Sequence, residues 1–212
     1  MSGFHAYFFD FDGTIGDTDV DIRAAWLAAI RQLRLPAEHF DSTFRVGPAI
    51  RETAMMLYPE LSDAESKTLQ NTYKHFYDDA ENYKARPYPG IIEKFRLLKS
   101  TGKKLYIVTN KRIKPLQKMV DLFDLTFFDG IFAPDTVDPE HHLNKAESLA
   151  LAIKVSAVSG SKCLMVGDTG FDIAAGKANS VATCAVTWGY GSRNDLINSG
   201  ADFVISTPEA LP

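Results

Sequence analysis

Five short apolar runs are spaced along the chain and have the length of β-strands. Most of them are rich in aromatic or β-branched residues, the residue types that strands favour. The five runs are residues 6–9, 104–108, 130–133, 162–166 and 182–186. We expect a sixth run, residues 202–205, to form a late strand at one edge of the same sheet.

Helix-length segments separate the later apolar runs, with apolar residues three and four positions apart. These segments are residues 91–100, 113–123, 145–155 and 171–179. Strands that alternate with single helices indicate parallel strands joined by crossover helices. The pattern therefore predicts an α/β fold with a Rossmann-like parallel sheet as its core.

The stretch between the first and second apolar runs is much longer than one crossover helix requires. It contains three further helical patterns, residues 20–34, 50–57 and 63–80, separated by proline and glycine residues. We interpret it as an inserted α-helical cap domain of residues 17–88. The Rossmann-like core domain would then consist of residues 1–16 and 89–212.

Composition narrows the class of protein. The chain has 212 residues, of which 45% are hydrophobic, so it can bury a substantial core. Its net charge of -4 and its lack of a long basic run argue against a nucleic-acid partner. We expect no membrane partner, since the sequence has no apolar span long enough to cross a bilayer. We expect a cytoplasmic location, because no secretory signal pattern is visible and both cysteines, Cys163 and Cys184, are interpreted as reduced core residues. Monomer and homodimer both remain open.

Polar residues follow three of the predicted strands, at the sheet edge where parallel α/β proteins bind ligands. They are Asp10 and Asp12, then Thr109, Asn110 and Lys111, then Asp168 and Asp172. Two carboxylates 4 Å apart repel by about 4 kcal/mol in an effective dielectric of 20, and a phosphate would add to this repulsion. Mg²⁺ relieves it, so these four aspartates predict a magnesium site. Taken singly, the aspartates also suit turns and helix N-caps.

The pair Asp10 and Asp12 can divide the work of phosphoryl transfer if the chain turns sharply at Gly13. Asp10 would attack phosphorus and form an aspartyl-phosphate. Asp12 would protonate the leaving oxygen and later deprotonate the water that releases phosphate. Thr109 would bind a phosphoryl oxygen, and a lysine would balance the charge.

These residues resemble the motifs of the haloacid dehalogenase superfamily. Asp10 to Thr14 are similar to its first motif, Asp-x-Asp-Gly-Thr, and Thr109 to its second, a Ser or Thr at a strand end. Gly167, Asp168 and Asp172 are similar to its fourth, Gly-Asp-x-x-x-Asp, and Lys145 is the best candidate for the lysine of its third.

The sequence is most similar to the phosphoglycolate phosphatase-like branch, which carries a helical C1-type cap. The similarity lies in Arg86-Pro-Tyr-Pro-Gly-Ile and Val166-Gly-Asp-Thr, whereas Ala146 follows Lys145 where that branch usually has proline. The resemblance implies a magnesium-dependent phosphatase that hydrolyses small phosphate monoesters, with a phosphoglycolate-like substrate favoured.

The resemblance also implies roles for the site residues. Asp10 and Asp168 would bind Mg²⁺ through their side chains and Asp12 through its backbone carbonyl, with Asp172 close by or acting through water. Lys145 would be catalytic, and Lys111 is a weaker rival for that role.

Four residues are expected to bind the small phosphorylated substrate: Thr109, Asn110, Arg45 and Arg51. The two arginines flank Gly47-Pro48 in the predicted cap, where a loop could reach the site and grip a carboxylate or second phosphate. A solvated helix face explains both arginines equally well.

Several other functions remain open. Sugar phosphatases, nucleotidases and pyrophosphatases of this superfamily share the strand-end motifs, and a phosphosugar mutase uses them to return the phosphoryl group to a bound sugar. The alternative from another class is a phosphoacceptor switch, which would hold its aspartyl-phosphate for minutes rather than hydrolyse it. The second carboxylate, Asp12, favours an enzyme.

Overall fold

A computed structural model describes residues 3–137 and 142–212, and within them the central sheet has six parallel strands in the order β5-β4-β1-β6-β7-β8. The strands are β1 (Ala6–Phe9), β4 (Lys104–Val108), β5 (Gly130–Phe132), β6 (Cys163–Gly167), β7 (Ala182–Val186) and β8 (Phe203–Ile205). This sheet confirms the predicted α/β class and the Rossmann-like core. The sixth apolar run, residues 202–205, contains β8, which lies at one edge of this sheet as predicted.

The register of the central strand fixes where the functional residues emerge. Strand β1 lies between β4 and β6, and Phe9 is aligned with Ile107 on one side and Val166 on the other. Because all three strands run in parallel, the residues that follow them leave the sheet at the same edge. The polar residues of three distant segments of the chain therefore meet there.

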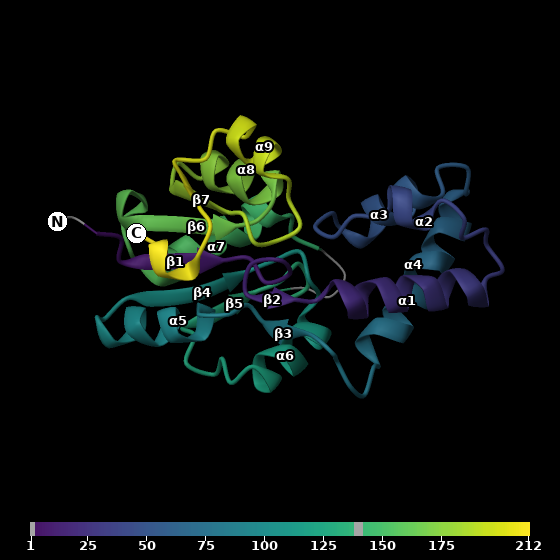
Figure 1. Ribbon diagram of the computed structural model, residues 1–212, viewed down its shortest axis with the longest axis horizontal. Helices are drawn as coiled ribbons and strands as arrows, with labels where there is room; N and C mark the ends of the chain where they lie inside the picture. Colours follow the sequence, from purple (N-terminus) through teal and green to yellow (C-terminus); the bar gives the residue numbers. More distant parts are fainter. Residues whose placement is uncertain (1–2, 138–141) are drawn as a thin grey trace.

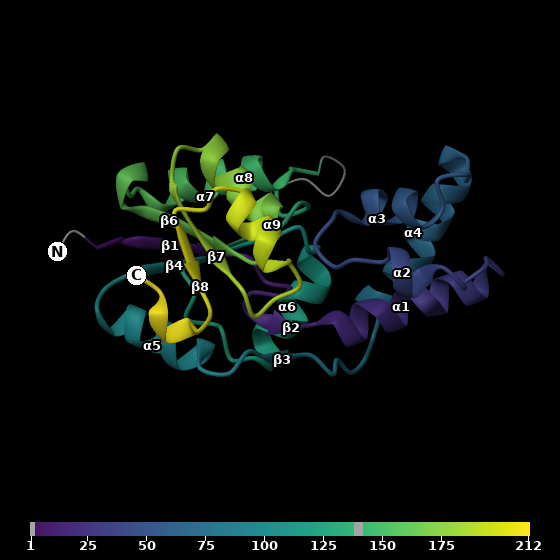
Figure 2. The same cartoon turned by 45° about the horizontal axis from the view of Figure 1, so that its top comes forward.

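Helices cover both faces of the sheet (Figures 1 and 2). Alternate residues of β1 point to opposite faces, as the two-residue period of a strand requires: Ala6 and Phe8 pack in one apolar cluster and Tyr7 and Phe9 in another. The surrounding helices are α5 (Ile91–Ser100), α6 (Ile113–Leu122), α7 (Lys145–Ser156), α8 (Gly170–Ala178) and α9 (Arg193–Asn198), with short 3₁₀ turns η1 (Gly160–Lys162) and η2 (Pro208–Ala210).

Four helices form a separate group beyond the edge of the sheet, at the right of Figure 1. They are α1 (Asp19–Gln32), α2 (Phe40–Thr43), α3 (Ile50–Leu57) and α4 (Asp63–Asp78). Trp26 of α1 stacks on Tyr73 of α4, with 4.2 Å between ring centres. A two-stranded antiparallel ribbon, β2 (Gly16–Asp17) and β3 (Arg86–Pro87), carries the chain into this group and back. Domain boundaries at residues 17 and 88 stay a prediction.

The predicted helices and strands differ from the observed ones mainly at their ends. Helix α1 stops at Gln32, two residues before the predicted end, and Arg34 has a positive φ of 56° that no α-helix accommodates. The short helices α2 and α9 and the ribbon were not predicted, since elements of two to six residues are too short to show periodicity.

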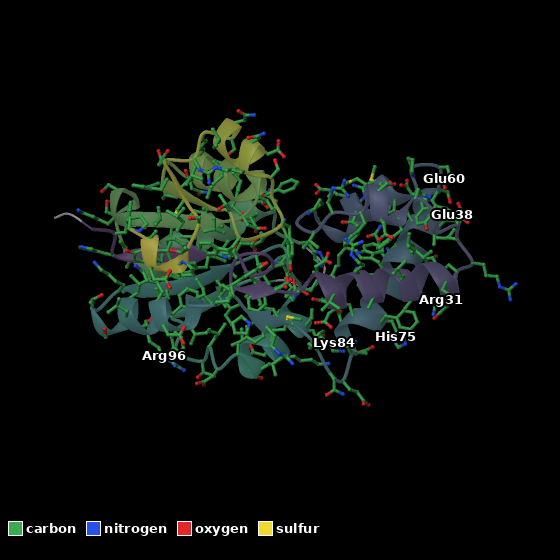
Figure 3. The ribbon with its side chains drawn as sticks, in the orientation of Figure 1. Arg31, Glu38, Glu60, His75, Lys84 and Arg96 are labelled. Carbon is green, nitrogen blue, oxygen red and sulfur yellow. The ribbon has the colours of Figure 1, made fainter. Side chains whose placement is uncertain are left out.

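The outer surface carries charged side chains that take no part in the strand-end cluster. Figure 3 labels six exposed examples that project outward: Arg31, Glu38, Glu60, His75, Lys84 and Arg96.

In the part of the chain that is described, no helix combines the length and the apolar character that a bilayer crossing requires.

Candidate active site

Three buried carboxylates meet beyond the carboxyl ends of β1 and β6. Asp10 follows β1, Asp168 follows β6, and Asp172 lies in the first turn of α8. One oxygen of each lies within 4.8 Å of the others, and none of the three residues is more than 3% exposed. The structure thus brings together the side chains of three of the four predicted magnesium ligands. The fourth, Asp12, is expected to bind through its backbone carbonyl, and that expectation stays a prediction.

Lys145 is the cation of this cluster. Its Nζ lies 2.8 Å from Asp10 Oδ2 and 2.6 Å from Asp172 Oδ1. Lys145 is the first residue of α7, where reciprocal hydrogen bonds between Asn144 and Glu147 cap the helix. Burial by itself lowers the pKa of Lys145, but the two ion pairs outweigh burial and raise the pKa above its ordinary value, so the side chain stays charged.

The carboxylates carry more negative charge than Lys145 neutralises. Burial, followed in size by repulsion from neighbouring aspartates, raises the pKa of Asp168 to about 8. Burial also raises the pKa of Asp10 to about 6, and the charge of Lys145 limits that increase. Hard oxygen donors that share excess negative charge are the ligands that a divalent cation such as Mg²⁺ prefers, so the residues fit such an ion.

Fixed hydrogen bonds orient Asp168. Its Oδ1 accepts from the Thr14 hydroxyl at 3.1 Å, and its Oδ2 accepts from the Tyr190 backbone N–H at 2.8 Å. Gly13 has a φ of 81°, and a Cβ on it would lie 2.1 Å from Asp168 Oδ2. The sharp turn expected at Gly13 is therefore present, and glycine is required there for close packing.

Asp172 is held as firmly as Asp168. Its Oδ2 accepts from both the backbone N–H of Thr169, at 3.0 Å, and the Thr169 hydroxyl, at 2.8 Å. Because its other oxygen accepts from Lys145, both oxygens of Asp172 already have protein partners. This carboxylate thereby fixes the position of the Lys145 ammonium group.

Asp12 is separate from the cluster and has its own cation. Its Oδ1 accepts from the Thr18 hydroxyl and from Lys111 Nζ, both at 2.7 Å. Lys111 Nζ also donates to the Tyr77 hydroxyl of helix α4. The two lysines treated as rivals in the sequence therefore occupy two different places: Lys145 pairs with Asp10, and Lys111 pairs with Asp12.

A small cavity of about 60 Å³ lies between the strand ends and the cap helices. Asp10, Asp12, Thr109 and Lys111 line it from the core. Thr109 is 1% exposed, and its hydroxyl accepts from the Lys111 backbone N–H at 3.1 Å. Two carboxylates, a hydroxyl and an ammonium group thus surround a space suited to a small molecule.

A loop of the cap closes this cavity. Asn110 Nδ2 donates to the Gly47 carbonyl at 3.2 Å, which joins the core to the loop. Arg45 and Arg51 are both exposed. Arg45 lines the cavity from the same loop and donates to the Phe44 carbonyl, whereas Arg51 of α3 lines a wider adjoining cleft of about 670 Å³. The structure therefore brings Arg45, but not Arg51, to the space beside Asp10.

The sequence prediction missed several residues at the site. Tyr77 of helix α4 belongs to the buried apolar cluster and also contacts Lys111. Arg112, directly after Lys111, pairs with Asp78 of the cap and, at 3.3 Å, with Asp135 of the core. Arg112 could have been found from its position shortly after a predicted strand. No local pattern, however, reveals which cap side chain will face it.

The fold places Asp10, a buried carboxylate, at the end of the central parallel strand β1. Residues 7–186 match the haloacid dehalogenase-like hydrolase family, and the chain belongs to this family. It is 32% identical to a phosphoglycolate phosphatase of Aquifex aeolicus over 96% of this chain and 92% of the relative.

Two further similarities bear on function and fold. The chain is 28% identical to pyrophosphatase PpaX of Bacillus cereus, over 93% of this chain and 89% of the relative. The solved structure of a haloacid dehalogenase-like family hydrolase from Streptococcus pneumoniae superposes with a TM-score of 0.85 and 27% identity, covering 99% of this chain and 97% of that one.

Proposed function

We propose that the chain is a magnesium-dependent phosphatase that hydrolyses small phosphate monoesters through an aspartyl-phosphate on Asp10. The observation that carries the proposal is the pairing of two carboxylates at one cavity. Asp10 belongs to a buried carboxylate cluster with a fixed lysine, and Asp12 lines the same small cavity with a separate lysine. Membership of the hydrolase family supports the same chemistry.

In this proposal, Asp10 and Asp168 hold Mg²⁺ through their side chains, Asp12 contributes its backbone carbonyl, and Asp172 lies close by. The ion, when bound, neutralises charge and orients the phosphate. A bond forms between an Asp10 oxygen and phosphorus as the bond from phosphorus to the leaving oxygen breaks. Asp12 gives its proton to that oxygen, so the alcohol leaves neutral.

Water completes the reaction. Asp12, now a carboxylate, removes a proton from a water molecule that attacks phosphorus, and the bond to Asp10 breaks. Inorganic phosphate leaves, and both aspartates return to their starting states. The Thr109 hydroxyl and the Lys145 ammonium group stabilise the phosphoryl oxygens in both steps.

The cavity supports a small substrate with a second anionic group. Its volume of about 60 Å³ leaves little room beyond a phosphate and a short chain. Arg45, Asn110 and Lys111 supply two cations and an amide along its wall. A phosphoglycolate-like substrate fits this requirement, since its carboxylate lies only a few bonds from phosphorus, and the Aquifex relative carries that name. Arg51 is proposed to contact a substrate only if the substrate extends into the wider cleft.

A second candidate substrate is pyrophosphate. The similarity to the Bacillus pyrophosphatase supports it, and its two phosphate groups would meet the same requirement for a second anion near Arg45. We also propose a cytoplasmic location, which the two free, buried cysteines support. Both monomer and homodimer are compatible with this function.

The test is magnesium-dependent release of phosphate from a panel of small esters and pyrophosphate, with Asp10→Asn in parallel. We expect release by the wild type alone, with phosphoglycolate or pyrophosphate far ahead of sugar phosphates and nucleotides. Isomerisation of a sugar phosphate that depends on a sugar bisphosphate, without phosphate release, would indicate a mutase. A long-lived phosphoprotein without release would indicate a phosphoacceptor switch.

A further inference from the structure

Tyr190 contacts the hinge of the cap from the opposite end of the chain. The hinge consists of residues 17–19, where the chain passes from the ribbon strand β2 into helix α1. The Tyr190 hydroxyl accepts from the backbone N–H of Thr18 at 2.6 Å and from that of Asp19 at 2.9 Å, and it donates to Asp17 Oδ1 at 3.0 Å. One hydroxyl group therefore binds all three hinge residues.

These bonds lie at the N-terminus of helix α1, beside the position where a side-chain cap is usually found. The first backbone N–H groups of a helix lack partners within the helix, and the side chain of the N-cap residue normally accepts from one of them. Thr18 is the N-cap residue of α1, yet its side chain makes no capping hydrogen bond. Its hydroxyl instead donates to Asp12 Oδ1 at 2.7 Å. Tyr190 instead binds the amides of the N-cap residue Thr18 and of the first helical residue Asp19, which a Thr18 side-chain cap would not reach.

The backbone of Tyr190 is bound at the other side of the site. Its N–H donates to Asp168 Oδ2 at 2.8 Å. A Cβ on Gly189 would lie 2.2 Å from the Gly13 carbonyl oxygen, and one on Gly191 would lie 1.9 Å from the Asp168 carbonyl oxygen. The two glycines let this segment pack directly on the loop after β1 and on Asp168. Tyr190 thus presents its hydroxyl to the hinge from a tightly packed backbone.

We infer that Tyr190 is a positioning residue that holds the cap hinge and, through Thr18, orients Asp12 toward the leaving group. This inference rests on the proposed function of Asp12, but the contact with the hinge is independent of it. Tyr190 touches no reacting atom in this scheme. Its effect on the reaction passes through a chain of two hydrogen bonds, Tyr190 to Thr18 and Thr18 to Asp12.

The first test follows amide hydrogen exchange in Tyr190→Phe, which removes only the hydroxyl and retains the ring and the bond to Asp168. We expect exchange at Thr18 and Asp19 to become faster by roughly ten-fold, since both amides lose their acceptor. Tyr58→Phe is the matched control, because the Tyr58 hydroxyl donates to the Pro36 carbonyl within the cap, away from the hinge. Unchanged exchange at both hinge amides would overturn the inferred contact.

The second test compares kcat/KM for an alkyl phosphate and for p-nitrophenyl phosphate. An alkyl alcohol needs a proton from Asp12 to leave, whereas p-nitrophenol needs little help. We expect Tyr190→Phe to lower kcat/KM roughly ten-fold for the alkyl ester and less than about three-fold for p-nitrophenyl phosphate. The magnesium concentration for half-maximal activity should stay the same, because the backbone N–H still orients Asp168.

A double-mutant cycle with Thr18→Val tests the route to Asp12. If Tyr190 acts through Thr18, the double variant loses no more activity than Thr18→Val alone. Additive losses, or an equal loss for both esters, would show a merely structural role and overturn the inference. If the wild type hydrolyses no ester, the proposed function fails, and hydrogen exchange still decides whether Tyr190 holds the hinge.

Discussion

Asp168→Asn is expected to stabilise the metal-free protein while abolishing its activity. Asp168 is fully buried, and burial followed by repulsion from Asp172 and Asp10 raises its pKa to about 8. A buried carboxylate with this pKa is destabilising whenever it is ionised without a cation. An asparagine side chain removes that charge and can still make both hydrogen bonds, because its carbonyl oxygen can accept from Tyr190 and its amide can donate to Thr14.

The sign and size of the effect follow from proton linkage. The pKa of Asp168 is raised from 3.8 in the unfolded chain to about 8 in the fold. The stability that this group contributes is therefore fully present below about pH 4 and is lost as the pH rises through 8. Between pH 5 and pH 8 the pH difference spans nearly three pKa units of 1.36 kcal/mol each, so the gain from Asp168→Asn should grow by ~4 kcal/mol.

Thermal unfolding in the presence of a chelator measures this difference. For a chain of this length, ~4 kcal/mol corresponds to a Tm increase of about 8 to 16 °C at pH 8 relative to the change at pH 5. Asp41→Asn is the control, because its side chain is 89% exposed and its removal should leave Tm nearly unchanged at both pH values. Mg²⁺ should raise the Tm of the wild type and not that of Asp168→Asn. A metal-free Asp168→Asn protein that is less stable than the wild type at pH 8 would refute the reasoning.

Three further predictions concern single residues. Lys111→Met removes the cation that pairs with Asp12, and steady-state assays should show kcat/KM lower by about 10- to 100-fold; an unchanged value would contradict this role. Arg45→Ala should raise KM for phosphoglycolate about ten-fold and leave KM for phenyl phosphate within about two-fold. Arg51→Ala is the control and should change KM for phosphoglycolate less. Equal effects of both variants would argue against a substrate contact of Arg45 in the small cavity. Asn144→Ala removes the N-cap of α7 and should lower the free energy of unfolding in urea by ~1 kcal/mol, and a smaller change would show that the helix start is held by packing.

Sequence patterns alone located the sheet and the convergence of carboxylates. Apolar runs with polar boundaries identify buried strands, and parallel strands necessarily deliver the residues that follow them to one edge. Asp10 and Asp168 could therefore be placed near each other without coordinates. Assigning Lys145 required the resemblance to a known family, because a lysine at a helix start has no local feature that distinguishes it from a solvated one.

The contacts of the cap could not be predicted in the same way. The hydrogen bond between Tyr190 and Thr18 joins residues 172 positions apart, and it depends on how two separately folded segments meet. Arg45 and Arg51 have the same chemistry and lie close in sequence, yet a cap loop directs only Arg45 to the small cavity. Local propensity carries no information on such orientations, since tertiary packing decides them.

The most direct test of the central claim is to identify the covalent intermediate. Asp12→Asn should slow the release of phosphate from Asp10 without removing the nucleophile. Acid quenching during turnover of p-nitrophenyl phosphate, whose leaving group needs little help from Asp12, should therefore trap a phosphoryl group. Mass spectrometry of the digested protein is predicted to place that group on Asp10, in near-stoichiometric amount and only when Mg²⁺ is present. Phosphate release without any adduct on Asp10, or an adduct on another residue, would contradict the account.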